Sequence, residues 1–137
     1  MTDRVRFEAG MAMRREVLGG DYVDRSLAAA SEFSMPMQEL VTEYCWGEIW
    51  NRPALSPRDR SLINLSMLTA LNRDRELKAH VRGALNNGLS VAEVQEALLQ
   101  TAVYCGVPAA ISSFRAAEEV VAEFEASAGS ETGDGVG

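Results

Sequence analysis

Residues 56–71 read SPRDRSLINLSMLTAL and predict a helix that is apolar over most of its circumference. Ser56 is a good N-cap, Pro57 suits the first helical position because its missing N–H is not needed there, and Asp59 suits the positive helix start. Only small polar residues separate the large apolar side chains, which are Leu62, Ile63, Leu65, Met67, Leu68 and Leu71. Such a pattern is typical of a central helix that neighbours cover on every side.

Apolar residues recur at helical spacing on both sides of this segment, and strand patterns are nearly absent. Capping residues, Gly and Pro bound each pattern, most clearly at the capping box of Ser90 and Glu93 and at the stop signal Asn86-Asn87-Gly88. We therefore predict an all-α bundle of about six to seven helices, at about residues 4–18, 21–30, 37–50, 56–71, 74–86, 90–105 and 108–126. We expect one domain over residues 1–127 and a flexible, Gly-rich C-terminal tail over 128–137.

The composition excludes several classes of partner. Thirteen basic and 20 acidic residues give a net charge of -7, which disfavours binding to nucleic acid and to anionic membranes. We see neither a signal peptide nor a long apolar run, so we expect a cytoplasmic protein. The two cysteines, Cys45 and Cys105, have neither metal-ligand nor redox spacing, and no phosphate-binding loop is present. We therefore predict no metal and no cofactor.

Two charged residues fall inside apolar helix faces. At 100° per residue, Glu48 lies in the apolar stripe of residues 37–50, and Arg14, with Arg15 beside it, lies in that of residues 4–18. Glu48 fits a structural salt bridge or a site whose pKa is tuned for proton transfer. Arg14 needs an anion, which could be Glu48 or a ligand carboxylate, unless its side chain extends to solvent. Arg60 likewise either binds an anion or extends its side chain to solvent.

Three more side chains are candidates for a site. Trp46 and Trp50 lie four apart on the face opposite the Glu48 stripe, so they are subunit contacts, pocket walls or ordinary core residues. His80 is the one histidine of the chain and lies at the border of an apolar stripe, on the flank of Glu76 and Asn87. A half-buried histidine there could act as an acid or base, or could simply be packed.

Four runs of sequence follow one another in the order RREVLGG (14–20), YCWGEIWNRPALSPRDRSL (44–62), HVRGALNNG (80–88) and LLQTAVYCGVPAA (98–110). Together they resemble the 4-carboxymuconolactone decarboxylase family over nearly the whole chain except the tail. The resemblance implies the helical fold shared with the alkylhydroperoxidase D group, assembled as a ring-like homo-oligomer, commonly a hexamer.

The resemblance also implies a reaction without a cofactor. A lactone dicarboxylate of the protocatechuate branch of the β-ketoadipate pathway loses carbon dioxide and gives the enol-lactone of 4-oxoadipate. By position, His80 becomes the candidate proton donor or oxyanion partner, and Glu48 the candidate for orienting it or sharing its proton. Arg14 and Arg60 become candidates for binding carboxylates, with Arg15 and Trp46 in the same pocket.

The sequence also departs from its relatives at two places. Redox-active relatives carry Cys-x-x-Cys-x-x-x-His where this chain has Arg73, Glu76 and His80, so thiol chemistry is not expected. Decarboxylase relatives often have asparagine and histidine where this chain has Ile111 and Arg115. An alternative is therefore a same-fold enzyme for another lactone or keto acid. A second alternative is a non-catalytic helical oligomer that binds a protein partner through Trp46 and Trp50.

Overall fold

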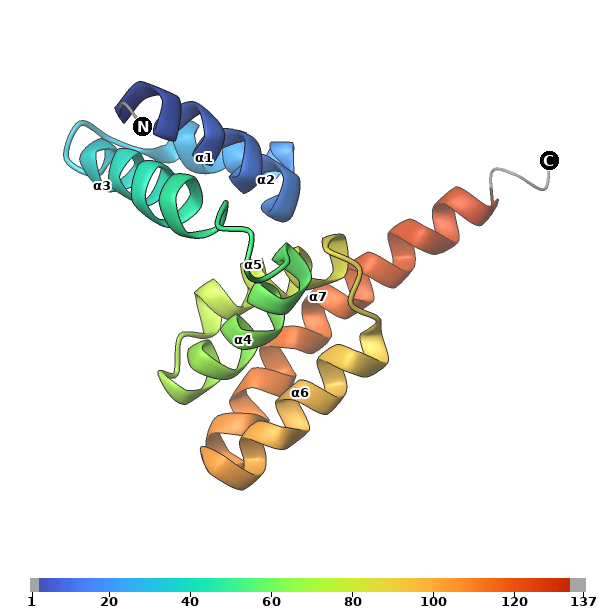
Figure 1. Ribbon diagram of the computed structural model, residues 1–137. Helices are drawn as coiled ribbons and strands as arrows, with labels where there is room; N and C mark the ends of the chain where they lie inside the picture. Colours follow the sequence, from blue (N-terminus) through green and yellow to red (C-terminus); the bar gives the residue numbers. More distant parts are fainter. Residues whose placement is uncertain (1–2, 134–137) are drawn as a thin grey trace. The chain divides into compact units, whose positions relative to one another are not determined.

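The computed structural model describes residues 3–133, and every regular element in that range is a helix (Figure 1). The all-α prediction is confirmed. The elements are α1 (Asp3–Leu18), α2 (Gly20–Ala29), α3 (Met35–Leu40), the π-helix η1 (Val41–Ile49), α4 (Pro57–Ala70), α5 (Asp74–Asn86), α6 (Val91–Tyr104) and α7 (Val107–Gly133). Within the described range, none of the helices has the length and apolarity needed to cross a membrane. The chain divides into two compact units, residues 1–60 and 61–137.

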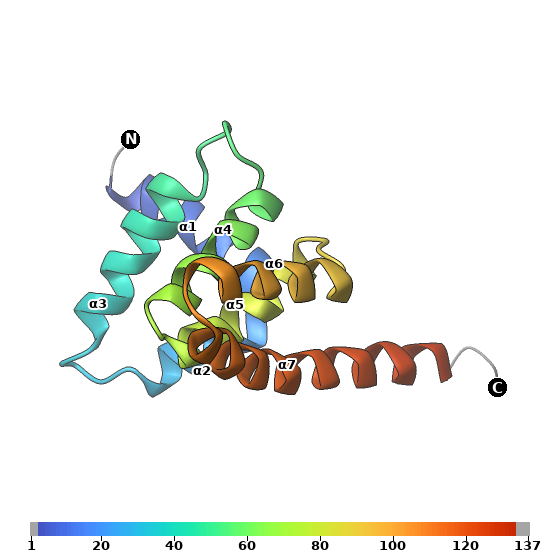
Figure 2. The same ribbon diagram turned by 90° about the horizontal axis from the view of Figure 1, so that it is seen from below.

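The first unit is organised around the packing of η1 on α1 (Figure 2). Two glycines allow the two backbones to approach closely. A Cβ atom on Gly10 of α1 would overlap the carbonyl oxygen of Thr42, and a Cβ atom on Gly47 of η1 would overlap that of Arg6. Any larger residue at either position would therefore push the two helices apart.

Residues 37–50 do not form the single α-helix that their periodicity predicts. The α-helical bonding of α3 ends at Leu40, and η1 continues with the wider turns of a π-helix. The Trp50 N–H, for example, donates to the Cys45 carbonyl oxygen, five residues back, at 2.9 Å. Because a π-turn holds more residues than an α-turn, the side chains that face α1 are not the ones that a 100° spacing selects.

The second unit has one apolar core, to which α4, α5, α6 and α7 all contribute. Its buried members are Leu65, Leu77, Val81, Ala84, Leu85, Leu89, Val94, Leu98, Ala116, Ala117 and Val120. Helix α7 packs on both α5 and α6, and its C-terminal part extends beyond them (Figures 1 and 2). It continues to Gly133, past the end that we expect near Ala126. Residues 134–137 of the expected tail lie outside the described residues, and the flexibility of the tail stays a prediction.

Helix α4 is not covered on every side, so the prediction of a central helix is wrong. Only one face, formed by Ser61, Leu65 and Thr69, is buried. The apolar residues of the other faces remain exposed, at 37–63% of their surface; they are Leu62, Ile63, Met67 and Leu71. A four-residue spacing places one stripe of the helix in the core, and the described chain leaves the others uncovered.

The ends of the helices follow the predicted signals in most cases. The capping box of Ser90 and Glu93 is present, with both reciprocal hydrogen bonds at 3.0 Å. The Ser56 hydroxyl accepts a bond from the Asp59 N–H at 3.2 Å at the start of α4. At the turn between α4 and α5, by contrast, the N-cap is Arg73, which makes no capping hydrogen bond with its side chain.

Candidate active site

His80 lies on α5 in the second unit and is half-buried, as its position at the border of the apolar stripe predicts. The Asn64 side-chain amide of α4 lies with its Nδ2 atom 3.4 Å from His80 Nδ1. Burial lowers the pKa of His80 from 6.5 to about 4, and the charge of Glu76, one turn earlier, opposes this shift only in part. The imidazole is therefore neutral at physiological pH.

Asn87, which the sequence also places on the flank of His80, has a defined partner of its own. The Asn87 amide donates to the Ser61 hydroxyl of α4 at 2.9 Å. Asn64, in contrast, had no signal in the apolar pattern that would connect it to His80. The α4–α5 face of the second unit thus holds a small group of polar side chains beside an apolar core.

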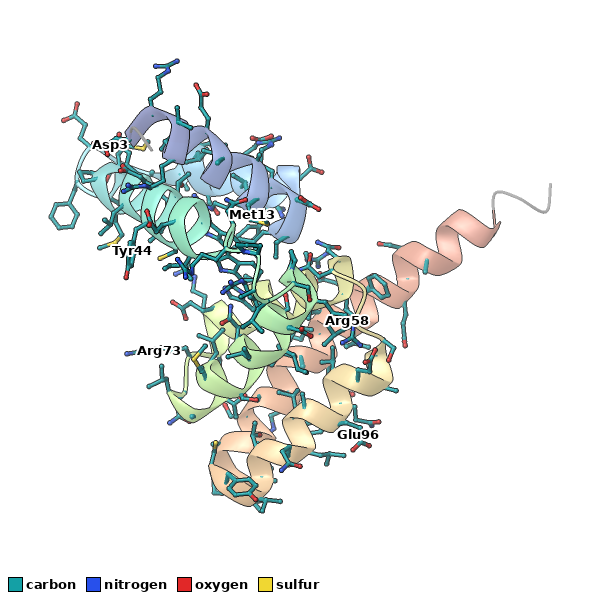
Figure 3. The ribbon with its side chains drawn as sticks, in the orientation of Figure 1. Asp3, Met13, Tyr44, Arg58, Arg73 and Glu96 are labelled. Atoms are coloured by element: carbon teal, nitrogen blue, oxygen red, sulfur yellow. The ribbon has the colours of Figure 1, made fainter. Side chains whose placement is uncertain are left out.

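Glu48 is exposed, with 43% of its side chain accessible, so its predicted place in a buried stripe is wrong. The π-helical turns direct Thr42, Trp46 and Gly47 to the buried side instead. The expected stripe lies on the outside, and Figure 3 shows Tyr44 projecting from the side of η1 opposite α1.

The cation that pairs with Glu48 is Arg6 of α1. The distance from Arg6 Nε to Glu48 Oε2 is 2.9 Å, and Arg6 Nη1 lies 3.6 Å from Glu43. Arg6 and Glu48 line a pocket of about 200 Å³, together with Gly47, Asn51 and Arg52. Glu48 therefore has the salt bridge that one of its two interpretations requires.

Arg14 is buried, with 5% of its surface exposed, which rules out a side chain that extends to solvent. Its Nη1 donates to Thr42 Oγ1 at 3.1 Å and its Nη2 donates to Gln38 Oε1 at 2.8 Å. Burial lowers its pKa from the usual value. Among the described residues, both of these hydrogen-bond acceptors are neutral, and the anion expected for Arg14 is not Glu48. A buried guanidinium held by neutral groups has no counter-charge among these two partners.

Arg15 and Arg60 have different partners. Arg15 Nη1 donates to Asp24 at 2.6 Å, and this bond raises the pKa of Arg15 and lowers that of Asp24. Arg60 Nη2 donates to the Arg52 carbonyl oxygen at 3.1 Å. In the described part of the chain, the buried Nε of Arg60 meets no hydrogen-bond acceptor. Arg60 therefore retains a free donor, whereas Arg15 is held in a surface ion pair.

Trp46 and Trp50 are buried, with 6% and 7% of their surface exposed. Their rings stack with centroids 4.6 Å apart and planes inclined by 25°. Of the interpretations open to them, packing within the chain is the one that fits these contacts.

The candidates are thus divided between the two units. Arg14, Arg15, Trp46, Glu48 and Arg60 belong to the first, and His80 belongs to the second. Sequence patterns did not indicate the side chains that hold them, namely Arg6, Gln38, Thr42 and Asn64. One feature of the sequence could have suggested a partner arginine on α1, namely the two carboxylates Glu43 and Glu48 on η1.

The two cysteines are free and half-buried, and burial raises the pKa of the Cys45 thiol. A raised pKa lowers the fraction of thiolate, which is the reactive form.

Comparison with known proteins shows which family the chain belongs to. The model of the carboxymuconolactone decarboxylase family matches residues 36–119. A nitrosuccinic acid decarboxylase from Metarhizium robertsii is 41% identical over 84% of this chain and 80% of its own length. A 4-carboxymuconolactone decarboxylase from Acinetobacter baylyi is 39% identical over 88% of this chain and 90% of its own length. A Pseudomonas putida sequence of the latter name is 40% identical over 35% of this chain. The chain therefore belongs to the carboxymuconolactone decarboxylase family.

Proposed function

We propose that the protein is a carboxy-lyase that converts 4-carboxymuconolactone to the enol-lactone of 4-oxoadipate without a cofactor. This reaction belongs to the protocatechuate branch of the β-ketoadipate pathway, in the cytoplasm. Two relatives that are similar over most of the chain are both named as decarboxylases, which supports the reaction class. The choice of the lactone as substrate is supported by the Acinetobacter relative, of which the chain covers 90%.

The observation that carries the proposal is the half-buried position of His80 beside the Asn64 amide. When the γ-carboxylate of the lactone leaves as carbon dioxide, its bonding electron pair moves through the unsaturated ring onto the carbonyl oxygen. A neutral imidazole with a pKa of about 4 is a poor source of protons at pH 7, but its N–H is a good hydrogen-bond donor to such an oxygen. Of the two roles open to His80, we therefore assign that of oxyanion partner. A water molecule then gives a proton to the α carbon and leaves as hydroxide.

The arginines provide the second requirement, because the substrate is a dicarboxylate that an acidic protein must attract locally. Arg14 is buried against neutral acceptors, and Arg60 keeps a donor that meets no acceptor in the described residues. Both features support their assignment to substrate carboxylates. Glu48, Arg15 and Trp46 are each engaged within the first unit, by Arg6, Asp24 and Trp50, so we assign none of them a contact with His80.

Nitrosuccinate is the second candidate substrate, because the Metarhizium relative is named for its decarboxylation. The chemistry is parallel. Loss of the carboxylate next to the nitro group leaves an electron pair that the nitro oxygens accept, and one carboxylate is retained. An oxyanion donor and a carboxylate-binding arginine would serve either substrate. The side chains at Ile111 and Arg115 remain a reason to test both.

The alternative of a non-catalytic protein that binds a partner through Trp46 and Trp50 loses its main support. Both rings are buried and stacked on each other, so neither forms an exposed aromatic patch.

The test is carbon dioxide release from freshly prepared 4-carboxymuconolactone and, separately, from nitrosuccinate, with purified protein and a chelator present. We expect rapid release from the lactone, with loss of its ultraviolet absorbance, and slower release from nitrosuccinate. Faster turnover of nitrosuccinate would assign the second substrate. No release from either would contradict both assignments.

We also propose that the protein acts as a homo-oligomer, as its family resemblance implies, with six chains. Exposed apolar residues on α6 and α7 support this assembly; they include Leu99, Val103, Tyr104, Val107 and Ile111. The expected mass by light scattering is six times that of the 14.9 kDa chain. A monomer at micromolar concentration would contradict it.

A further inference from the structure

Asn64 is the side chain of α4 that meets His80, and the two come from helices that both contribute to the core of the second unit. Its Nδ2 atom lies 3.4 Å from His80 Nδ1, and both residues are half-buried. The neighbouring Leu65 is fully buried and fixes the rotation of α4 about its axis. The position of the amide relative to the ring is therefore set by the core rather than by a surface side chain.

We propose that Asn64 is a positioning residue that holds neutral His80 in the tautomer with its proton on Nε2. An amide NH₂ group can only donate, so a hydrogen bond over this 3.4 Å contact favours an accepting, unprotonated His80 Nδ1. The hydrogen bond at one ring nitrogen determines which form the other takes. The inference rests on the proposed function for its catalytic meaning, although the tautomer itself can be measured without turnover.

The tautomer matters because only a protonated Nε2 can donate to the substrate oxygen that receives the electron pair. In the reaction as proposed, the bond between the ring carbon and the carboxylate breaks, carbon dioxide leaves, and the electron pair ends on the carbonyl oxygen. The Nε2–H donates a hydrogen bond to that oxygen without giving up its proton. In the opposite tautomer, Nε2 would present a lone pair to a developing negative charge and would raise the barrier.

The charges around His80 are compatible with this role. Glu76 is the charged group that acts on it from its own helix, and α4 contributes the neutral Asn64. Helix α5 faces α7 through Lys78, which pairs with Glu119 at 2.6 Å, and through Arg82, which pairs with Glu123. These pairs lie on a different flank of α5, because two residues correspond to about 200° around a helix.

The experiment uses the fact that the chain has one histidine, so that its ring gives a single set of NMR signals. Two-bond ¹H–¹⁵N spectra of tag-free protein distinguish a protonated ring nitrogen from an unprotonated one. We expect the wild type to show Nε2 protonated and Nδ1 unprotonated at pH 7.5. The isosteric Asn64→Asp variant should move the proton to Nδ1 and raise the pKa of His80, because the introduced carboxylate accepts from Nδ1–H.

The activity of Asn64→Asp should then be low above the raised pKa of His80 and recover below it, whereas a simple loss of structure would not be reversed by lowering the pH. Above the raised pKa, its neutral ring has no proton on Nε2, and we expect kcat to fall by about 10²- to 10³-fold, as for loss of an oxyanion donor. Below that pKa the cationic ring again carries a proton on Nε2, so activity should recover. KM should change little, because Asn64 does not contact substrate in the proposal.

Gln100→Glu on α6 is the matched control, since it makes the same change of charge at an exposed position. It should leave the tautomer and kcat unchanged. Asn64→Ala serves if Asn64→Asp does not fold, and should give a mixture of the two tautomers with a reduced kcat.

The outcomes separate this inference from the proposed function. If the tautomer shifts as expected but the wild type releases no carbon dioxide, the role of Asn64 stands and the proposed activity fails. If the wild type is active and Asn64→Asp retains both the Nε2–H tautomer and the wild-type kcat, Asn64 is not a positioning residue, and the activity stands.

Discussion

His80 shows how a single side chain can be identified from sequence while its chemical state cannot. Its place at the border of an apolar stripe predicts a half-buried ring, and the structure has one. The direction of its pKa shift depends on burial, which lowers the pKa, against the opposing charge of Glu76. This burial, which the tertiary packing sets, changes the assignment from proton donor to neutral hydrogen-bond donor.

The lowered pKa of His80 predicts how stability depends on pH. Because its pKa is about 4 in the folded protein and 6.5 in the unfolded chain, only the unfolded chain takes up a proton between these values. Its contribution is complete above pH 6.5 and is lost as the pH falls toward 4. Between pH 7 and pH 5 the loss should be roughly 2 kcal/mol. The measurement is urea unfolding at both pH values for the wild type and for His80→Gln.

Other groups titrate in the same range, so the informative quantity is the difference between the two proteins. His80→Gln should lose less stability than the wild type on acidification. Equal losses in both would mean that the ring is not held neutral in the folded protein.

The charged residues show where sequence reasoning succeeds and where it fails at this scale. Arg14 is predicted inside an apolar face and is buried there, because α1 is a regular helix to which a 100° spacing applies. Glu48 is predicted by the same rule and is exposed, because η1 is a π-helix. Neither Arg6, which pairs with Glu48, nor Gln38, which holds Arg14, has a local signal in the sequence.

At the scale of elements, the contact between α1 and η1 is the feature most sensitive to substitution. Gly10→Ala places a methyl group against the Thr42 carbonyl, which is backbone and cannot rotate away. We expect a loss of about 1–3 kcal/mol in the free energy of unfolding, although alanine is the better helix former. Chemical denaturation of the two proteins measures this difference.

Gly129→Ala is the control, because a Cβ atom there meets nothing within 4 Å and the position is helical. It should leave stability unchanged or raise it by up to about 1 kcal/mol. If Gly10→Ala is as stable as Gly129→Ala, the close approach of α1 and η1 is not what requires glycine at position 10.

Helix boundaries that depend on local chemistry were predictable, and helix environments were not. The capping box at Ser90 and the N-cap at Ser56 form as expected because both involve residues three apart. The apolar body of α4 predicts burial on every side, yet Leu62, Ile63 and Met67 are exposed. A hydrophobic pattern indicates which side chains need cover, but it does not say whether the same chain supplies that cover.

At the scale of the whole molecule, the acidic chain combines a net charge of -7 with buried or partly buried arginines. The overall charge favours solubility, and in the proposed function the local arginines bind the anionic substrate. Family membership follows from motifs spread over the chain, but the identity of the substrate does not. Two relatives of nearly equal similarity carry the names of different substrates.

The role of His80 is best tested by carbon dioxide release from 4-carboxymuconolactone by the wild type and by His80→Ala, at pH 7.5 with a chelator present. We expect turnover by the wild type and a kcat lower by about 10²- to 10³-fold in the variant, the effect of removing one oxyanion donor. A variant that folds normally and turns over the lactone at the wild-type rate would contradict it.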